Sequence, residues 1–224
     1  AAKAGGPNRL ATLGTWRPTT GRAASGTLHL RGLDSRVTAL IEAAQSDLAF
    51  DDFDWVRRAA LSDALAWDRE FGVIRDVTRL GIERNLFRYR PSAIALRACA
   101  ETPVRVVLRL VIAAVRSQAD FTLSTADGLP INLRRSLGEA GITLFVETDD
   151  QFVQRVVASR VPRVRVTGAD AADTAALVRA KSEVPVATFS HPATTVGRVE
   201  LLAYVREQTV SIGGRSVAAF SDVI

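Results

Sequence analysis

Cys99 and His191 are the side chains best able to carry covalent or acid–base chemistry. Cys99 is the single cysteine of the chain, and a thiol nucleophile needs an adjacent base. Because no histidine lies near it in the sequence, we interpret Cys99 as a small buried side chain. His191 ends an apolar run, but no serine, carboxylate or second histidine forms a recognisable catalytic constellation with it. The sequence therefore predicts a structural histidine and no catalytic residue.

Residues 166–173 form the segment most able to hold a phosphate. A glycine-flanked turn before a helix can seat a pyrophosphate on free backbone N–H groups. Here Gly168 is followed by Asp170 and Asp173, whose carboxylates would repel that anion. The Gly-x-Gly-x-x-Gly fingerprint of dinucleotide sites is absent from the sequence. We therefore predict a degenerate nucleotide site, with no cofactor and no metal in this chain.

Five short apolar runs recur from residue 93 onward, each followed by a segment with helical periodicity. Their valine, isoleucine, threonine and phenylalanine content suits a pleated surface. Strands that alternate with helices favour right-handed crossovers, and these predict an α/β fold with a doubly wound, mainly parallel sheet of about five strands. The predicted strands are residues 93–96, 121–123, 143–146, 164–166 and 186–189.

Amphipathic segments predict helices before and between these strands. Two early helices follow Asp34 and the pair Asp51 and Asp52, whose carboxylates suit a helix N-terminus. The next helix begins at Thr102, which we expect to be its cap, and its arginines at 105, 109 and 116 are expected to face solvent. Further helices are predicted after residues 127–130, after residues 148–150 and over residues 197–206.

Composition limits the function classes. The chain has 224 residues, of which 47% are hydrophobic and 24% charged, as in ordinary globular proteins. The apolar run 104–115 is shorter than a membrane span and is interrupted by arginines. The chain has one cysteine, which fits a reducing compartment, so we expect a cytoplasmic protein. The net charge of +5 comes from scattered arginines without exposed aromatic partners, which argues against nucleic-acid binding. The absence of methionine suggests a piece of a longer polypeptide.

Three stretches together resemble the aldehyde dehydrogenase superfamily. They are similar to the C-terminal end of the long bacterial bifunctional proline-utilisation flavoenzymes, which join a proline dehydrogenase to an L-glutamate γ-semialdehyde (1-pyrroline-5-carboxylate) dehydrogenase. The opening loop resembles the aldehyde anchor of the dehydrogenase module, the second stretch resembles the entry to a nucleotide-binding-like domain, and the third resembles a closing helix. These stretches are residues 3–8, 83–91 and 197–208.

The resemblance implies particular roles for individual residues. Gly5 and Gly6 would bind the substrate α-carboxylate through backbone N–H groups, although a surface turn explains the same residues. Ser124 stands where the family places the lysine that holds the adenosine ribose. The parent enzyme would use NAD and FAD, whereas this chain would hold neither.

The resemblance also implies a domain organisation. Residues 1–20 would end the semialdehyde dehydrogenase module, residues 21–82 would be linker and helices, residues 83–207 a degenerate nucleotide-binding-like α/β domain, and residues 208–224 a C-terminal tail.

We expect a non-catalytic domain that covers the channel of the intermediate. It would pack against the upstream dehydrogenase module of the same polypeptide in a homo-oligomeric parent, through early helices that carry Trp55 and Trp67 and through residues 208–224. Two alternatives stay open from the sequence: an NAD- or nucleotide-binding domain with residual function, and a basic nucleic-acid-binding adaptor.

Overall fold

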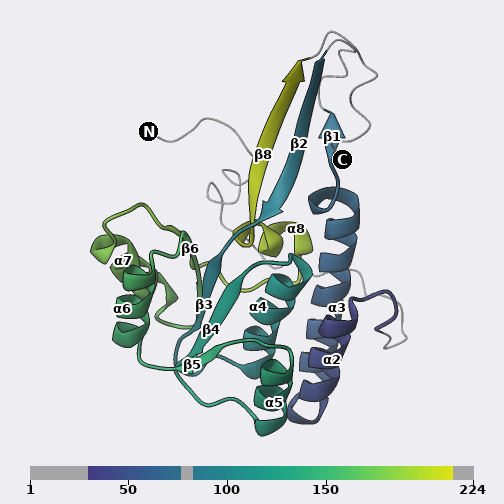
Figure 1. The fold of residues 1–224 in the computed structure, drawn as a ribbon. Coiled ribbons are helices and arrows are strands. Elements are labelled where there is room, and N and C mark those ends of the chain that lie inside the picture. The colour runs from purple at the N-terminus through teal and green to yellow at the C-terminus, as the bar shows by residue number, and fades with distance from the viewer. Residues whose placement is uncertain (1–29, 77–82, 214–224) are drawn as a thin grey trace.

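A parallel sheet forms the centre of the chain (Figure 1). The structure, a computed structural model, describes residues 30–76 and 83–213, so the predicted anchor residues Gly5 and Gly6 lie outside the described residues. The sheet has the strand order β5-β4-β3-β6-β7, and every neighbouring pair is parallel. The five predicted strands are therefore confirmed. They are β3 (Ile94–Ala98), β4 (Phe121–Thr125), β5 (Leu144–Val146), β6 (Arg163–Thr167) and β7 (Ala187–Phe189).

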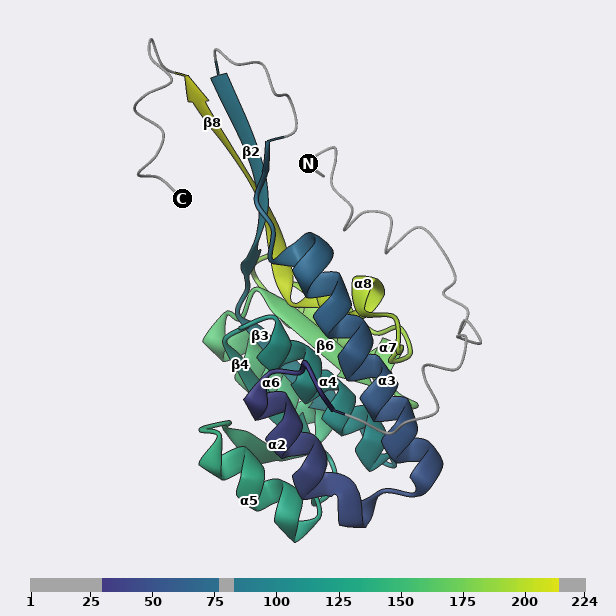
Figure 2. The same cartoon turned by 90° about the vertical axis from the view of Figure 1, so that its right-hand side faces the viewer.

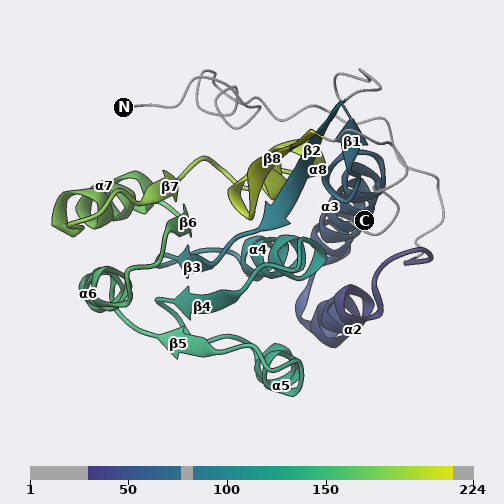
Figure 3. The same ribbon diagram turned by 45° about the horizontal axis from the view of Figure 1, so that its top comes forward.

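Helices cover both faces of this sheet, as a doubly wound fold requires (Figure 3). One face carries α4 (Val104–Arg116) and α5 (Ile131–Glu139), and the other carries α6 (Asp149–Ser159) and α7 (Ala171–Lys181). Each face has its own cluster of buried apolar side chains. The early helices α2 (Ser35–Ala44) and α3 (Phe50–Ala66) pack outside α4 and α5, and a π-helical turn (Trp67–Phe71) continues α3.

Local capping explains where several helices begin. The Asp34 carboxylate accepts a hydrogen bond from the backbone N–H of Arg36, and Thr148 forms a reciprocal capping box with Gln151. The predicted cap at Thr102 is wrong, because its hydroxyl donates to the carbonyl of Cys99 at 2.6 Å and α4 begins after Pro103.

The prediction that Arg109 faces solvent is also wrong. The buried face of α4 includes Val107, Leu108 and Val111, as its periodicity predicts. Because α3 packs on the side of α4 away from the sheet, a second side of α4 is buried as well. The Arg109 side chain lies there with no exposed surface.

A long antiparallel ribbon projects from the amino edge of the sheet (Figure 2). It consists of β1 (Arg75–Asp76), β2 (Glu83–Pro91) and β8 (Val205–Gly213), with β2 in the middle. The predicted last helix is therefore wrong beyond residue 203. The chain forms only a short α8 (Gly197–Glu200) and a 3-10 turn (Leu201–Ala203), because residues 205–213 pair with β2 along their whole length.

The predicted domain boundaries stay a prediction, and β8 crosses the position at 207–208 where the tail was expected to begin. Among the described residues, no helix is both long and apolar enough to span a bilayer.

Candidate functional site

The carboxyl edge of the parallel sheet is the candidate site. All five strands end there, and open α/β sheets bind ligands where the strand order reverses. In this sheet the reversal lies between β3 and β6, so the loops after Ala98 and after Thr167 would form the crevice. The two loops start close together, because the N–H of Cys99 donates to the carbonyl of Thr167, the last residue of β6, at 2.9 Å and continues the β3–β6 ladder.

Gly168 lets these loops approach so closely. Its backbone has φ +114°, a conformation that other residues rarely adopt, and a Cβ placed on it would lie 2.7 Å from Thr102 Oγ1 and 2.9 Å from Cys99 Cβ. Asp170 and Asp173 follow at the start of α7, and both are exposed. The glycine therefore serves loop packing, and the carboxylates occupy the helix terminus that would attract a phosphate.

A buried arginine fills the neighbouring part of the edge. Arg97, on β3, has no exposed surface and donates to Ser124 Oγ at 2.8 Å and to the Glu147 carbonyl at 2.9 Å. Its Nε donates to Asp149 Oδ1 at 2.8 Å; Nη2 is equally close to that oxygen but poorly aligned, so its contact is electrostatic. Ser124 therefore binds a protein side chain at the position where the sequence predicted the loss of a ribose contact.

Glu147 also belongs to this polar cluster. Burial alone would raise its pKa, but hydrogen bonds from Arg155 and Ser124 outweigh this effect and lower the pKa. The Arg155 guanidinium also stacks over the Phe145 ring, 4.0 Å from its centroid. The charges of Glu147 and Arg155 therefore form an ion pair within the protein.

Cys99 has the environment of a structural thiol. It is 1% exposed, and burial raises its pKa, so the thiolate required of a nucleophile is disfavoured. Its sulfur lies 3.8 Å from the hydroxyl of Thr174 on α7. The prediction that Cys99 is a buried side chain is confirmed.

His191 lines a cavity of about 330 Å³ at the same edge, together with Trp55, Arg105, Gly168 and Ser190. Its Nε2 is buried, and no described group hydrogen-bonds to it. Burial and the charge of Arg165 lower its pKa to about 4, so the imidazole is neutral near pH 7. The lining includes no carboxylate or thiol that could act with it.

Two further arginine pairs hold the segment that contains His191. Arg165 contacts Glu200 at 2.9 Å and donates to the carbonyl of His191 at 2.7 Å. Arg109 binds both carboxylate oxygens of Asp63 and donates to the carbonyl of Thr194 at 2.7 Å. All four of these charged side chains are fully buried. The segment after β7 is therefore fixed from both sides.

Electrostatics distinguishes the two buried carboxylates. Burial raises the pKa of Asp63 to about 6, although Arg109 opposes the shift. Burial would also raise the pKa of Glu200, but Arg165 and Arg109 together lower it to about 2. Neither arginine pair was predicted. For Arg165 the signal in the sequence is an arginine inside an apolar strand, as also at Arg97, whereas Arg109 lies on a helix and has no such signal.

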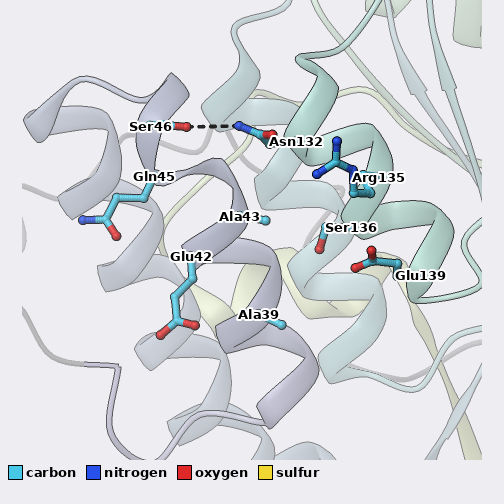
Figure 4. A pocket seen from close by; sticks show the side chains of 9 residues that line it. All are labelled: Ala39, Glu42, Ala43, Gln45, Ser46, Asn132, Arg135, Ser136 and Glu139. Carbon is cyan, nitrogen blue, oxygen red and sulfur yellow. Dashed lines mark hydrogen bonds between the residues drawn. The ribbon is translucent and has the colours of Figure 1, made fainter.

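An open groove of about 880 Å³ lies between α2 and α5 (Figure 4). Asn132 and Ser46 form a 3.5 Å hydrogen bond across it, and Glu42, Arg135 and Glu139 contribute charges of both signs. Its lining includes the hydroxyls of Ser46 and Ser136 but no histidine or cysteine. Within residues 30–76 and 83–213, no three histidine, cysteine, aspartate or glutamate side chains could hold a metal ion.

Solved structures match this chain over most of its length. Proline utilization A (PutA) from Corynebacterium freiburgense matches 96% of the chain at 27% sequence identity with a TM-score of 0.60. The chain resembles part of proline utilization A. The matched part is 18% of the Corynebacterium protein, so the chain spans less than a fifth of that polypeptide.

Other matches share the fold at lower identity. A substituted PutA from Bradyrhizobium japonicum matches 69% of the chain and 19% of its own length, at 17% identity and a TM-score of 0.56. An NAD-dependent benzaldehyde dehydrogenase from Corynebacterium glutamicum matches 70% of the chain and 40% of its own length, at 13% identity and a TM-score of 0.52. The chain thus has an aldehyde-dehydrogenase-like α/β fold. No family model matches the sequence, and no curated protein matches it.

Proposed function

We propose that this chain is a non-catalytic, aldehyde-dehydrogenase-like domain of a bifunctional proline dehydrogenase and L-glutamate γ-semialdehyde dehydrogenase. In that cytoplasmic enzyme of proline catabolism, the upstream modules use FAD and NAD. This domain covers the route of the intermediate between them and supports the packing of the homo-oligomer. The similarity to proline utilization A over 96% of the chain supports this parentage.

The buried Arg97 carries the non-catalytic part of the proposal. Its guanidinium donates to Ser124 and to Asp149, so these polar groups already have a partner inside the protein. A nucleotide would have to displace a buried charge that leaves Asp149 unpaired, which costs free energy. The adjacent cavity beside His191 is lined by Gly168 and Arg105 and is the remaining open part of this edge.

Calorimetric titration of the whole chain with NAD tests this part. We expect no specific heat up to millimolar NAD. A saturable heat would instead support the nucleotide-binding alternative, and an Arg105→Gln variant would then show whether the cavity beside His191 is responsible.

Exposed apolar side chains at the carboxyl edge support the packing role. Phe50 is 68% exposed at the start of α3, and Ile131 is 63% exposed at the start of α5. The hydrogen bond between Ser46 and Asn132 brings these two helix starts together. By contrast, Trp55 and Trp67 are partly buried against the core, and Arg105 and Arg116 cover their rings. The packing face is therefore the one around Phe50 and Ile131.

A channelling assay tests this role in the full-length parent. We expect Phe50→Asp with Ile131→Asp to introduce a lag before NADH forms from proline, while each half-reaction keeps its own rate. Leu65→Asp, at a 51% exposed position near the other end of α3, is the matched control and should cause no lag. An unchanged time course in the double variant, with unchanged self-association, would refute the covering and packing roles.

A further inference from the structure

A small cavity lies where the end of α3 meets the base of the ribbon, at the amino edge of the sheet (Figure 1). Its lining comes from the π-helical turn after α3, from the end of β2 and from the turn after α4. Because β2 leads into β3 and α4 leads into β4, the cavity lies at the opposite end of the strands from the carboxyl edge. Its volume of about 300 Å³ suits a small molecule.

Three aromatic side chains form the apolar wall of this cavity: Trp67, Phe71 and Tyr89. Phe71 and Tyr89 are buried and meet edge to face, with their ring centroids 4.8 Å apart. The guanidinium of Arg116 lies 5.7 Å from the centroid of the Trp67 ring and pairs with Asp68 at 2.5 Å. These contacts hold the rings in place, so the wall is formed before any ligand binds.

The indole N–H of Trp67 is a hydrogen-bond donor at the cavity. The N–H of Gly72 donates to the carbonyl of Trp67 at 2.8 Å, and a Cβ added to Gly72 would lie 2.7 Å from Trp67 Nε1. The φ of Gly72 is −86°, which any residue adopts, so this glycine provides space for the indole. Within residues 30–76 and 83–213, no acceptor forms a hydrogen bond with Trp67 Nε1, although tryptophan N–H groups usually have one when buried. Such π-helical turns are frequent at functional sites.

The charged part of the lining is cationic. Arg88 and Arg90 line the cavity, and no aspartate or glutamate does. Arg90 is exposed, and Arg88 donates through Nε to the neutral Gln208 at 2.8 Å. Asp76 lies on the same face of the ribbon as Arg88 but outside the lining. The groove between α2 and α5 differs, because its lining carries charges of both signs. The cavity at the amino edge therefore favours an anion.

Two further carboxylates act on Tyr89 without lining the cavity. Burial raises the pKa of Tyr89, and the charges of Glu207 and Glu70 add to this shift. Glu70 pairs with Arg198 at 2.6 Å. The Tyr89 hydroxyl therefore stays protonated near pH 7. Because the two carboxylates oppose an anion, we expect its affinity to be modest.

Gln118 adds a neutral polar group from the turn after α4. Its φ is +56°, in the left-handed region where a helix more often ends with glycine or asparagine. A non-glycine residue in this conformation is strained, and such residues cluster at ligand sites. The Gln118 side chain is exposed and lines the cavity, so its amide can donate to a ligand.

We propose that this cavity binds a small carboxylate with a flat apolar body. The carboxylate accepts hydrogen bonds from Trp67 Nε1, Arg90 and Gln118, and the flat body packs against the aromatic wall. An inorganic anion would leave the wall uncovered, and a neutral ring would leave the arginines without a counter-charge. This inference does not depend on the proposed function, because it uses only the cavity at the amino edge.

NMR spectroscopy of the whole 224-residue chain, labelled with ¹⁵N, tests the proposal through the indole N–H signals of its three tryptophans. Trp55→Phe and Trp67→Phe, made one at a time, assign these signals. The probe is benzoate; benzamide has the same ring without the charge, and acetate has the charge without the ring. We expect benzoate to shift the Trp67 signal saturably at about 1–10 mM. Benzamide should bind at least about threefold more weakly, and acetate should not saturate in this range.

Arg90→Gln should weaken benzoate binding by at least about threefold. Arg134→Gln is the matched control, since Arg134 is exposed on α5, lies outside the lining and gives the same change in net charge. This control should bind benzoate like the unchanged chain, and both variants should keep the melting temperature to within a few degrees.

Three results would overturn the proposal. The first is a Trp67 signal that benzoate does not shift saturably, including the case in which only the Trp55 signal, from the cavity beside His191, responds. The second is benzamide binding as tightly as benzoate. The third is an equal effect of Arg90→Gln and Arg134→Gln on the affinity for benzoate.

Discussion

The two ends of the molecule use the same residue type in opposite ways. At the carboxyl edge, Arg97 and Arg165 are fully buried and each contacts a carboxylate. On the ribbon at the amino edge, Arg90 and Arg206 are exposed and face each other. The first two arginines fill part of the edge at which open α/β sheets bind ligands, and the second two present a charged surface. The comparison shows that the role of an arginine depends on which residue it contacts, and that the count of arginines in a region does not determine this role.

The largest expected effect comes from breaking a buried pair. Arg165→Leu would leave Glu200 as a buried charge without its main partner, so we expect the free energy of unfolding to fall by about 3–5 kcal/mol. Denaturant unfolding measures this loss. Arg206→Leu on the ribbon is the control and should change stability little. A similar loss in both variants would contradict the contrast between the two ends.

The stability of the chain as a function of pH tests the burial of His191 at the carboxyl edge. The folded pKa of His191 is about 4 and its ordinary value is 6.5, so the unfolded chain binds more protons between these values and stability falls as the pH drops from 6.5 to 4. The contribution reaches about 3 kcal/mol. Asp63, with its raised pKa, acts in the opposite direction over part of this range. The difference between the unchanged chain and His191→Gln therefore isolates the histidine, and parallel pH curves would contradict the prediction.

A smaller effect is expected where the two loops of the edge meet. Gly168→Ala would combine a positive φ with a Cβ placed against Thr102 and Cys99, so we expect a loss of about 2 kcal/mol in unfolding experiments. Gly128→Ala is the control, because its φ is not positive and no atom lies within 4 Å of the added Cβ. If both variants were equally stable, the close loop contact would not be required.

The smallest effect is expected on the ribbon, with the opposite sign. Arg206→Gln removes one of two like charges that face each other, so we expect a gain of about 0.5 kcal/mol in stability. Thermal unfolding at low salt measures it, and added salt should reduce the gain. A loss of stability would indicate that Arg206 has a structural partner.

The sequence predicts the parallel sheet because its signals are local. The apolar runs are rich in residues that suit strands, and capping groups such as Asp34 and Thr148 mark helix starts. The ribbon was not predicted because its two strands are separated by the whole α/β body. Val199, Leu202 and Val205 also have helical spacing, although the helical turns end at Ala203.

The sequence-based prediction of the candidate site concerned mainly the residues expected of a nucleotide site that this chain does not have. Asp170 and Asp173 argue against a bound phosphate through their charge, whereas the expected loss of a ribose contact at Ser124 rests on the family resemblance. The sequence could not show what replaces these contacts, because Arg97 meets Asp149 only after two crossovers bring them together. Arg109 was assigned to the surface because a helical stripe shows one buried face, whereas α4 is buried on two sides.

The pairing of β2 with β8 has a mechanical consequence. These strands are the entry to and the exit from the α/β body, and they are hydrogen-bonded from Pro91 opposite Val205 to Glu83 opposite Gly213. The body is thus a closed loop on a stem. A force that pulls residues 83 and 213 apart would act on the stem first, and the segment from β3 to the 3-10 turn would be stretched only after the stem had separated.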